Sequence, residues 1–142
     1  MQVTINEKLQ VISTIAKIHR AIQRELNRRL KDLNLSYLDF LVLRSTIEGP
    51  KPMVYIANRY YVTQATITSS VDKLENMGLV RRVRSSEDRR VILIEITEKG
   101  KEIYEEGLKL YRELVEEIMK EIRDNEVLDL LNKLNMILSK LG

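Results

Sequence analysis

Arginines crowd into a short run between a helical stretch and a β-branched stretch, and this order limits the fold more than any other feature of the chain. Residues 81–90 hold five arginines: Arg81, Arg82, Arg84, Arg89 and Arg90. Residues 63–77 before them have helical spacing, and residues 91–96 after them are rich in branched apolar side chains. Apolar alternation on both sides of a polar turn at 85–88 predicts a β-ribbon. Its charge exceeds what packing can use and favours a negatively charged partner, although a solvated surface hairpin would carry the same charges.

The composition indicates one globular domain. The chain has 142 residues, 44% of them hydrophobic, and no cysteine. This length and apolar content suit a single domain with its own core. No run approaches the roughly 18 apolar residues of a membrane span, and the N-terminus lacks a basic flank before an apolar core, so we expect a cytoplasmic protein. The lack of cysteine excludes disulfides, thiolate zinc sites and redox sensing through a thiol.

Charge is distributed unevenly along the chain. Residues 97–142 hold 8 Lys and Arg against 11 Asp and Glu, a net charge of −3, whereas the whole chain has +3. A basic front and middle joined to an acidic end indicate that one face meets a polyanion while the last segment has another role.

The apolar pattern predicts a long first helix over residues 6–33 with two apolar sides. One stripe comprises Leu9, Ile12, Ala16, His19, Leu26, Leu30 and Leu33, and the other comprises Val11, Ile15, Ile18 and Ile22. The second stripe requires another surface, either the chain's own C-terminal helices or a partner subunit. A lone histidine in such a stripe, as at His19, is more often a core or interface residue than a ligand.

Three shorter helices follow. Ser36 and Asp39 resemble a capping box that starts a helix at 37–47, and Pro52 suits the first turn of a helix at 53–60. Thr63 suits the N-cap of the next helix, in which Ile67, Val71 and Leu74 form the predicted buried stripe. The opposite face is small and polar and can lie against a flat, hydrogen-bonding surface. It comprises Gln64, Ala65, Thr68, Ser69, Asp72, Lys73 and Asn76.

Two more helices are predicted after the ribbon. Thr97 can cap a long helix, and Asp124 suits the cap of the last one. The last helix has a stripe that is wide enough to require a partner surface. The stripe comprises Val127, Leu131, Leu134, Leu138 and Leu141.

Two short helices, the second capped and polar-faced, followed by a basic ribbon, form the order of a winged helix-turn-helix. The predicted fold class is therefore mainly α with a small β-ribbon (α+β). A helix about 10–12 Å across fits the major groove of DNA, where small polar side chains reach base edges. Gln64, Thr68 and Ser69 are the base-reading candidates, and Lys73 is better placed to hold a phosphate.

An arginine at the tip of the ribbon suits the minor groove, whose negative potential deepens where the groove narrows. Arg89 and Arg90 are the candidates. Asp88 has two interpretations that remain open: it pairs with an arginine and fixes its direction, or it favours the local bend of the turn.

Three stretches together resemble a known family. They are residues 64–82 (QATITSSVDKLENMGLVRR), 88–90 (DRR) and 96–100 (ITEKG). The combination is specific: a helix that ends in this sequence, an Asp-Arg-Arg tip of the ribbon and a Thr-Glu-Lys-Gly stretch after its second strand. Along essentially its whole length the chain resembles the MarR family of multiple-antibiotic-resistance-type regulators.

The resemblance implies one MarR-like domain over residues 1–142 that represses transcription as a homodimer. Residues 1–33 and 98–142 would form interlocked dimerisation helices, and residues 36–97 the DNA-binding module. Two such modules would read a pseudo-palindrome with half-sites roughly 34 to 36 Å apart. The predicted DNA-binding residues are Gln64, Ala65, Thr66, Thr68, Ser69, Lys73, Arg84, Asp88, Arg89 and Arg90.

Members of this family often respond to small phenolic or aromatic anions bound between the dimerisation helices and the winged module. Lys17 and Arg20 lie three residues apart beside an apolar stripe, and Tyr37 and Tyr111 belong to helices that would border such a site. They could hold an aromatic carboxylate such as salicylate, which would loosen DNA binding. Solvated cations and tyrosines packed at a helix junction explain the same residues.

Other function classes fit less well. One histidine, no cysteine and no glycine-rich phosphate loop leave no catalytic or metal site, so the sequence predicts neither an enzyme nor a cofactor. A winged-helix module that binds protein is a more serious alternative, since fold does not fix function. A nonspecific architectural DNA-binding protein would use the arginines without needing the polar helix face.

Overall fold

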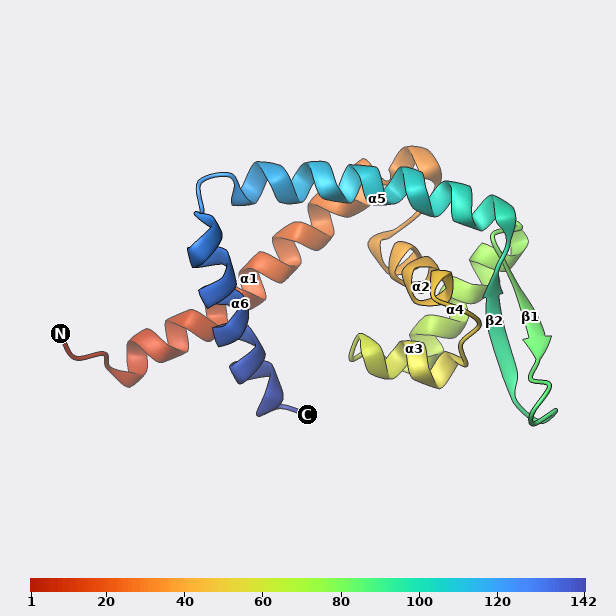
Figure 1. The fold of residues 1–142 in the computed structure, drawn as a ribbon, viewed down its shortest axis with the longest axis horizontal. Helices are drawn as coiled ribbons and strands as arrows, with labels where there is room; N and C mark the ends of the chain where they lie inside the picture. The colour runs from red at the N-terminus through yellow and green to blue at the C-terminus, as the bar shows by residue number, and fades with distance from the viewer. The chain divides into compact units, whose positions relative to one another are not determined.

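The computed structural model describes residues 1–142 as an α+β fold of helices with one two-stranded hairpin, which confirms the predicted class (Figure 1). The helical elements are α1 (Ile5–Arg29), the short 3-10 helix η1 (Lys31–Leu33), α2 (Tyr37–Ile47), α3 (Met53–Arg59), α4 (Gln64–Asn76), α5 (Glu98–Met119) and α6 (Asp124–Ser139). The strands are β1 (Val80–Arg84) and β2 (Ile92–Ile96). Residues 1–110 and residues 111–142 each form a compact unit.

Local caps begin α2 and α4 as the sequence predicts. The backbone N–H of Asp39 donates to Ser36 Oγ (3.0 Å), and the N–H of Ser36 donates back to Asp39 Oδ2 (2.9 Å). Thr63 Oγ1 accepts the N–H of Thr66 (3.2 Å). Pro52 lies just outside α3 as its N-cap rather than inside the first turn, with extended backbone angles.

The hairpin is antiparallel, with Val80 opposite Ile96 and Arg84 opposite Ile92. Lys51 adds a short bridge on the other side of β2, where its N–H and carbonyl group pair with the backbone of Ile94 (3.0 and 2.7 Å). Helix α4 packs against α2, α3 and β1. Their shared core is fully buried and comprises Phe40, Leu43, Ile56, Ile67, Leu74, Leu79 and Ile94.

Thr97 joins the start of α5 to the end of α4. Its Oγ1 accepts the backbone N–H of Gly100 (3.0 Å) and donates to the carbonyl oxygen of Gly78 (2.7 Å). Its own N–H donates to the carbonyl oxygen of Leu79 (3.0 Å), and a Cβ on Gly100 would lie 2.1 Å from that same oxygen. Position 100 therefore accepts no side chain, which gives the physical reason for the glycine of the Thr-Glu-Lys-Gly stretch.

Two predicted helix ends are wrong. The first helix ends at Arg29 rather than at Leu33, because the chain turns through η1 and through a left-handed Asn34 (φ 59) to bury Leu35. Asparagine tolerates this conformation better than most residues. The cap of α6 is Arg123 rather than Asp124, and its N–H donates to Glu126 Oε1 (3.1 Å).

The first and last helices leave most of their apolar side chains exposed in the single chain. Leu26 is the buried residue of α1, and α6 has no buried residue at all. His19 is exposed, so it does not belong to the core of this chain. None of the helices combines the length and the apolar content that crossing a membrane requires.

Candidate nucleic-acid interface

Helix α4 has an apolar base and an open polar side. Ile67, Val71 and Leu74 are fully buried, as their spacing predicts. Thr68 is half-buried. The candidate Thr66 is exposed, and so are the other residues of the predicted polar side: Gln64, Ala65, Ser69, Asp72, Lys73 and Asn76. No bulky apolar side chain of α4 stands in the way of a flat partner on this side.

Contacts within the chain occupy some of these groups. Thr68 Oγ1 donates to the carbonyl oxygen of Gln64 (2.9 Å) and lies 3.3 Å from the sulfur of Met53. Thr66 Oγ1 lies 2.8 Å from Thr63 Oγ1. The side-chain amides of Gln64 and Asn76 and the hydroxyl of Ser69 are exposed and make no side-chain-to-side-chain bond, so they are available to a partner.

The charge of Lys73 is paired within the chain. Its Nζ donates to Oδ2 of Asp39 (2.6 Å), a buried residue of α2. Ser70, which is also buried, donates to the other carboxylate oxygen (2.6 Å). This ion pair competes with the phosphate contact that the sequence predicts for Lys73.

Two of the five hairpin arginines fix the base of the hairpin. Arg82 reaches Asp72 (2.7 Å) and Glu75 of α4, and the hydrogen bond to Asp72 is the largest cause that raises the pKa of Arg82. Arg81 pairs across the strands with Glu95 (2.6 Å). Contacts within the chain therefore use more of the arginines than the sequence predicts. Asp72 helps to hold the hairpin against α4 and does not belong to a free polar face.

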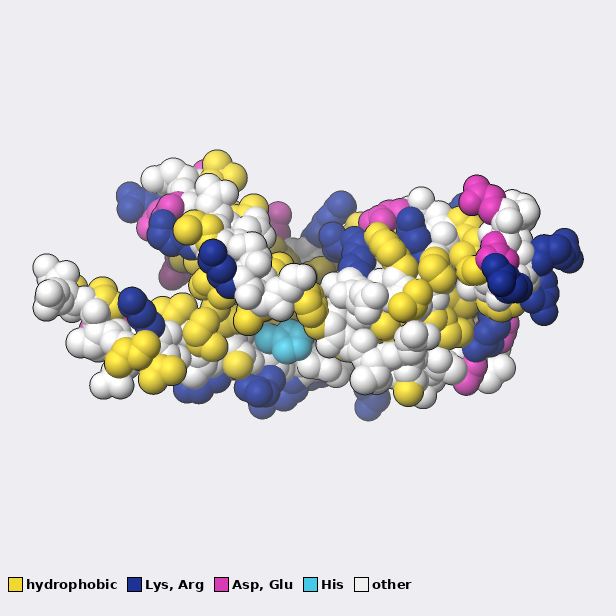
Figure 2. Space-filling model, turned by 90° about the horizontal axis from the view of Figure 1, so that it is seen from below, with side chains coloured by type: hydrophobic (Ala, Val, Ile, Leu, Met, Phe, Trp, Pro, Cys, Tyr) yellow, Lys and Arg dark blue, Asp and Glu magenta, His cyan; other side chains and the backbone are white.

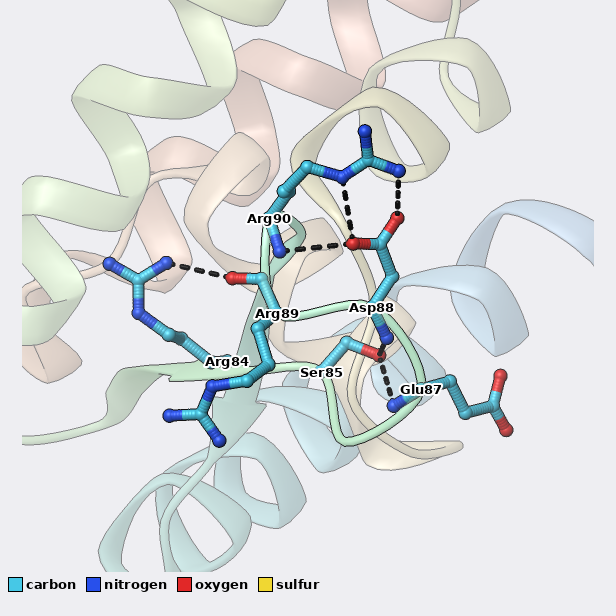
Figure 3. Close-up of polar contacts among 6 residues, drawn as sticks. All are labelled: Arg84, Ser85, Glu87, Asp88, Arg89 and Arg90. Atoms are coloured by element: carbon cyan, nitrogen blue, oxygen red, sulfur yellow. Dashed lines mark hydrogen bonds and ion pairs between the residues drawn. The ribbon is translucent and has the colours of Figure 1, made fainter.

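The other three arginines lie at the tip of the hairpin (Figure 3). Arg84 donates to the carbonyl oxygen of Arg89 (2.9 Å) and so braces the loop. Arg90 donates to both carboxylate oxygens of Asp88, each at 3.1 Å. The guanidinium of Arg89 has no dashed contact in Figure 3 and points away from the Asp88–Arg90 pair. Arg89 is therefore the unpaired cation of the tip.

Asp88 has both of the roles that the sequence leaves open. Its Oδ1 also accepts the backbone N–H of Arg90 (3.1 Å), a local bond that shapes the turn. Hydrogen bonds from the Arg90 side chain, and then from the Arg90 backbone, lower the pKa of Asp88 below its usual value. The ionised carboxylate thus bends the turn and directs Arg90, whose side chain is 91% exposed.

Lys and Arg side chains stand out at the right of the space-filling view, where the hairpin lies (Figure 2). Acidic side chains lie among them, in keeping with the ion pairs of Arg82 and Arg90. The hairpin thus presents a projecting cationic tip rather than a uniformly basic surface.

The four residues predicted to hold an aromatic anion lie on three elements. Lys17 and Arg20 are exposed on α1, and Tyr37 is the half-buried first residue of α2. The backbone N–H of Tyr37 donates to Asn27 Oδ1 (2.7 Å). Tyr111 is half-buried on α5 and belongs to the unit of residues 111–142. Their shared role as a ligand site stays a prediction.

Sequence reasoning missed the residues that tie α4 to its surroundings. Ser70 gave a signal, because it lies three residues after Ile67 and four before Leu74 on the buried side of α4, where a polar group needs a hydrogen-bond partner. Glu75 gave none, because its partner Arg82 belongs to another element. The structure brings together no group of three His, Asp or Glu side chains that could hold a metal ion.

Comparison with sequence families and curated proteins identifies relatives of this chain. A family model described as transcriptional regulator SarA/Rot matches residues 26–107. The chain is 35% identical over 104 residues to YpoP of Bacillus subtilis, described as an uncharacterised HTH-type transcriptional regulator. That match covers 72% of this chain and 73% of YpoP.

Solved structures share the fold over nearly the whole chain. The transcriptional regulator BldR from Sulfolobus solfataricus is 51% identical, with a TM-score of 0.90 over 98% of this chain and 99% of BldR. A mutant of MarR from E. coli, in complex with operator DNA, is 26% identical, with a TM-score of 0.82 over 96% of this chain and 99% of MarR.

Proposed function

Because this chain belongs to the MarR-type winged-helix transcriptional regulators, we propose that it binds a pseudo-palindromic DNA operator as a homodimer and represses transcription there. In such a fold α3 and α4 form the helix-turn-helix, α4 is the recognition helix and the β1–β2 hairpin is the wing. The recognition helix would lie in the major groove while the wing tip reaches the adjacent minor groove. A DNA-binding regulator acts where the chromosome lies, so we expect the protein in the cytoplasm.

The wing tip is the observation that carries this proposal. Arg90 projects from the loop with its direction held by the Asp88 carboxylate, and the Arg89 guanidinium beside it is unpaired. A pre-oriented guanidinium loses little freedom on binding and matches the negative potential of a narrow minor groove. On the recognition helix, Gln64 and Ser69 offer polar groups for base edges. A MarR mutant with 26% identity was crystallised with operator DNA, which supports the same partner for this chain.

The homodimer is supported by the apolar side chains that the single chain leaves exposed. On α1 these include Ile5, Leu9 and Ile12, with 52–67% of their surface exposed. On α6 they are Leu128, Leu130, Leu131, Leu134, Met136 and Leu138. Exposed apolar stripes of this length mark interaction surfaces, and a second copy of the same chain buries both kinds of stripe at once.

A mobility-shift titration tests the proposal directly. The DNA upstream of the protein's own gene is compared with a scrambled duplex of equal length at about 0.15 M salt, a salt level at which specific binding is typically at least about a thousandfold tighter than nonspecific binding. We expect the protein to prefer the upstream DNA by at least this factor, and we expect Arg90→Ala to reduce this preference. Equal binding to both duplexes would favour an architectural protein, and no binding would favour a protein-interaction module.

Release by an aromatic carboxylate is the regulatory part of the proposal. Lys17 and Arg20 offer cations on α1, and Tyr37 and Tyr111 offer aromatic rings on α2 and α5. A ligand acts on DNA binding only to the extent that it binds the two states of the protein differently. Operator affinity measured with and without saturating salicylate tests this part, and an unchanged affinity would contradict it.

A further inference from the structure

A buried carboxylate joins α2 to the recognition helix. Asp39 lies in the first turn of α2 with 3% of its surface exposed. Its Oδ1 accepts a hydrogen bond from Ser70 Oγ (2.6 Å), and its Oδ2 accepts from Lys73 Nζ (2.6 Å) and from the Ser36 N–H (2.9 Å). A buried charge is costly unless it is paired and hydrogen-bonded. The need of Asp39 for a counter-charge therefore decides where the side chain of Lys73 points.

Lys73 lies on the row of the recognition helix that faces the proposed duplex. Ala65, Ser69 and Lys73 follow one another at intervals of four residues, so they share one side of α4. The side chain of Lys73 is 47% exposed, and yet its ammonium group lies 2.6 Å from the carboxylate of Asp39. If the side chain of Lys73 were free to extend toward the duplex, it would bind the phosphates of DNA of any sequence, because phosphate contacts carry no sequence information.

We infer that Asp39 is a specificity-determining residue, whose carboxylate occupies Lys73 in place of a DNA phosphate and so lowers the affinity for DNA of unrelated sequence. This inference rests on the proposed function. Specificity is a difference of affinities, so a weaker attraction to every duplex raises the preference for the operator even though it adds no contact to a base. Asp39 acts through Lys73 and does not itself contact the DNA.

Two variants with the same residue at position 39 isolate this effect. Asp39→Asn keeps the shape of the side chain, removes its charge and frees the lysine. The double variant Asp39→Asn/Lys73→Gln loses the same carboxylate bonds but has no lysine to free. Circular dichroism and thermal unfolding of the full-length proteins establish that both are folded. Any difference in DNA binding between the two variants then reports the freed ammonium group.

The readout is the salt dependence of binding to scrambled DNA, between about 50 and 200 mM salt. Each phosphate that a protein neutralises changes the slope of log K against log salt concentration by about 0.9. We expect the slope of Asp39→Asn to be steeper than that of the double variant by about this amount. Over this range of salt, the affinity of Asp39→Asn for scrambled DNA would then fall by a factor about 3.5 times larger than that of the double variant. We also expect Asp39→Asn to have a smaller operator preference than the wild type. A change that only damaged the fold would weaken binding without steepening the slope.

Equal slopes for the two variants would overturn the inference while leaving the proposed function intact. If the wild type bound upstream DNA and scrambled DNA with equal affinity, the proposed function would be overturned, and the inference with it.

A measurement on the wild type keeps the inference testable if Asp39→Asn does not fold. The Nζ signal of Lys73 is followed by NMR in protein with ¹⁵N-labelled lysine, and Lys73→Arg assigns that signal. We expect the signal to stay in place as scrambled DNA is added, because the ammonium group remains on Asp39. A Lys73 signal that shifts on addition of this DNA would overturn the inference.

Discussion

The five arginines of the hairpin have different partners although they share one chemistry. Arg82 is bound by two carboxylates of α4, Arg84 by a backbone carbonyl group, and Arg90 by the carboxylate of Asp88. Arg89 projects without such a partner in the tip. Because a paired guanidinium has a set direction and an unpaired one does not, we expect Arg90 to contribute geometry at the minor groove and Arg89 to contribute charge.

The titration of Asp88 measures how firmly Arg90 is held. The folded pKa of Asp88 lies below its ordinary value of about 3.9, because it accepts hydrogen bonds from Arg90. The pair therefore stabilises the tip above about pH 4, and this stabilisation is lost as the pH falls through the folded pKa. We expect a carboxyl ¹³C titration to give a midpoint below 3.9 in the wild type and a higher midpoint in Arg90→Ala. Arg89→Ala is the control, and equal midpoints in the wild type and Arg90→Ala would refute the pairing.

Gly100 is the residue at which the smallest side chain matters most. In an ordinary helix, Gly→Ala stabilises a protein by about 0.5–1 kcal/mol. Here the added Cβ would lie 2.1 Å from the Leu79 carbonyl oxygen, which itself accepts the N–H of Thr97. We expect Gly100→Ala to lower the free energy of unfolding by about 2–4 kcal/mol, measured by urea denaturation. Glu102→Ala, an exposed change in the same helix, should stay within about 0.5 kcal/mol. A stabilised Gly100→Ala would contradict this packing.

At the scale of elements, one side chain makes the ion pairs between the wing and the recognition helix. Arg82 of β1 joins Asp72 and Glu75, which lie one turn apart on α4. Arg81, its neighbour in sequence, bonds only across the hairpin to Glu95. One arginine therefore links the wing to the helix by ion pairs, and the other links the two strands of the wing to each other.

This division predicts different outcomes for two equal changes of charge. Arg82→Gln should accelerate amide hydrogen exchange along β1 and β2 and cost about 1–2 kcal/mol of stability, because two carboxylates lose their partner. Arg81→Gln removes an exposed pair and should cost no more than about 1 kcal/mol. Hydrogen-exchange mass spectrometry compares the two variants. Equal exchange rates in the two would mean that the ion pairs with α4 do not hold the wing.

At the scale of the whole molecule, the exposed apolar stripes of α1 and α6 require a partner surface. Leu131 is 52% exposed on the apolar side of α6, whereas Asp129 and Lys133 form an exposed ion pair on a polar side of the same helix (2.9 Å). Leu131→Arg should weaken self-association by at least about 30-fold, since burial of a leucine contributes about 2 kcal/mol and a buried unpaired charge adds a further cost. Sedimentation equilibrium measures this change. Asp129→Arg introduces the same side chain on the polar side of α6 and should leave the dimer intact, and a wild type that sediments as a monomer would contradict the homodimer.

Much of the fold follows from rules that act within a few residues. The capping boxes and caps at Ser36, Thr63 and Thr97 and the buried stripe of α4 are set by bonds and spacings of three or four positions, so the sequence predicts them correctly. The Asp-Arg-Arg stretch likewise contains its own ion pair between Asp88 and Arg90. These features therefore gave the class of fold and the location of the candidate site.

The partners of Lys73 and Arg82 could not be predicted in this way. Asp39 and Lys73 are separated by 34 positions, and neither residue lies in a pattern that refers to the other. The early end of α1 also depends on a distant cause, the burial of Leu35 in the core. Periodicity says which face of a helix is buried, but only packing brings a particular buried carboxylate beside a particular lysine. In this protein that packing decides which cations remain free to meet DNA.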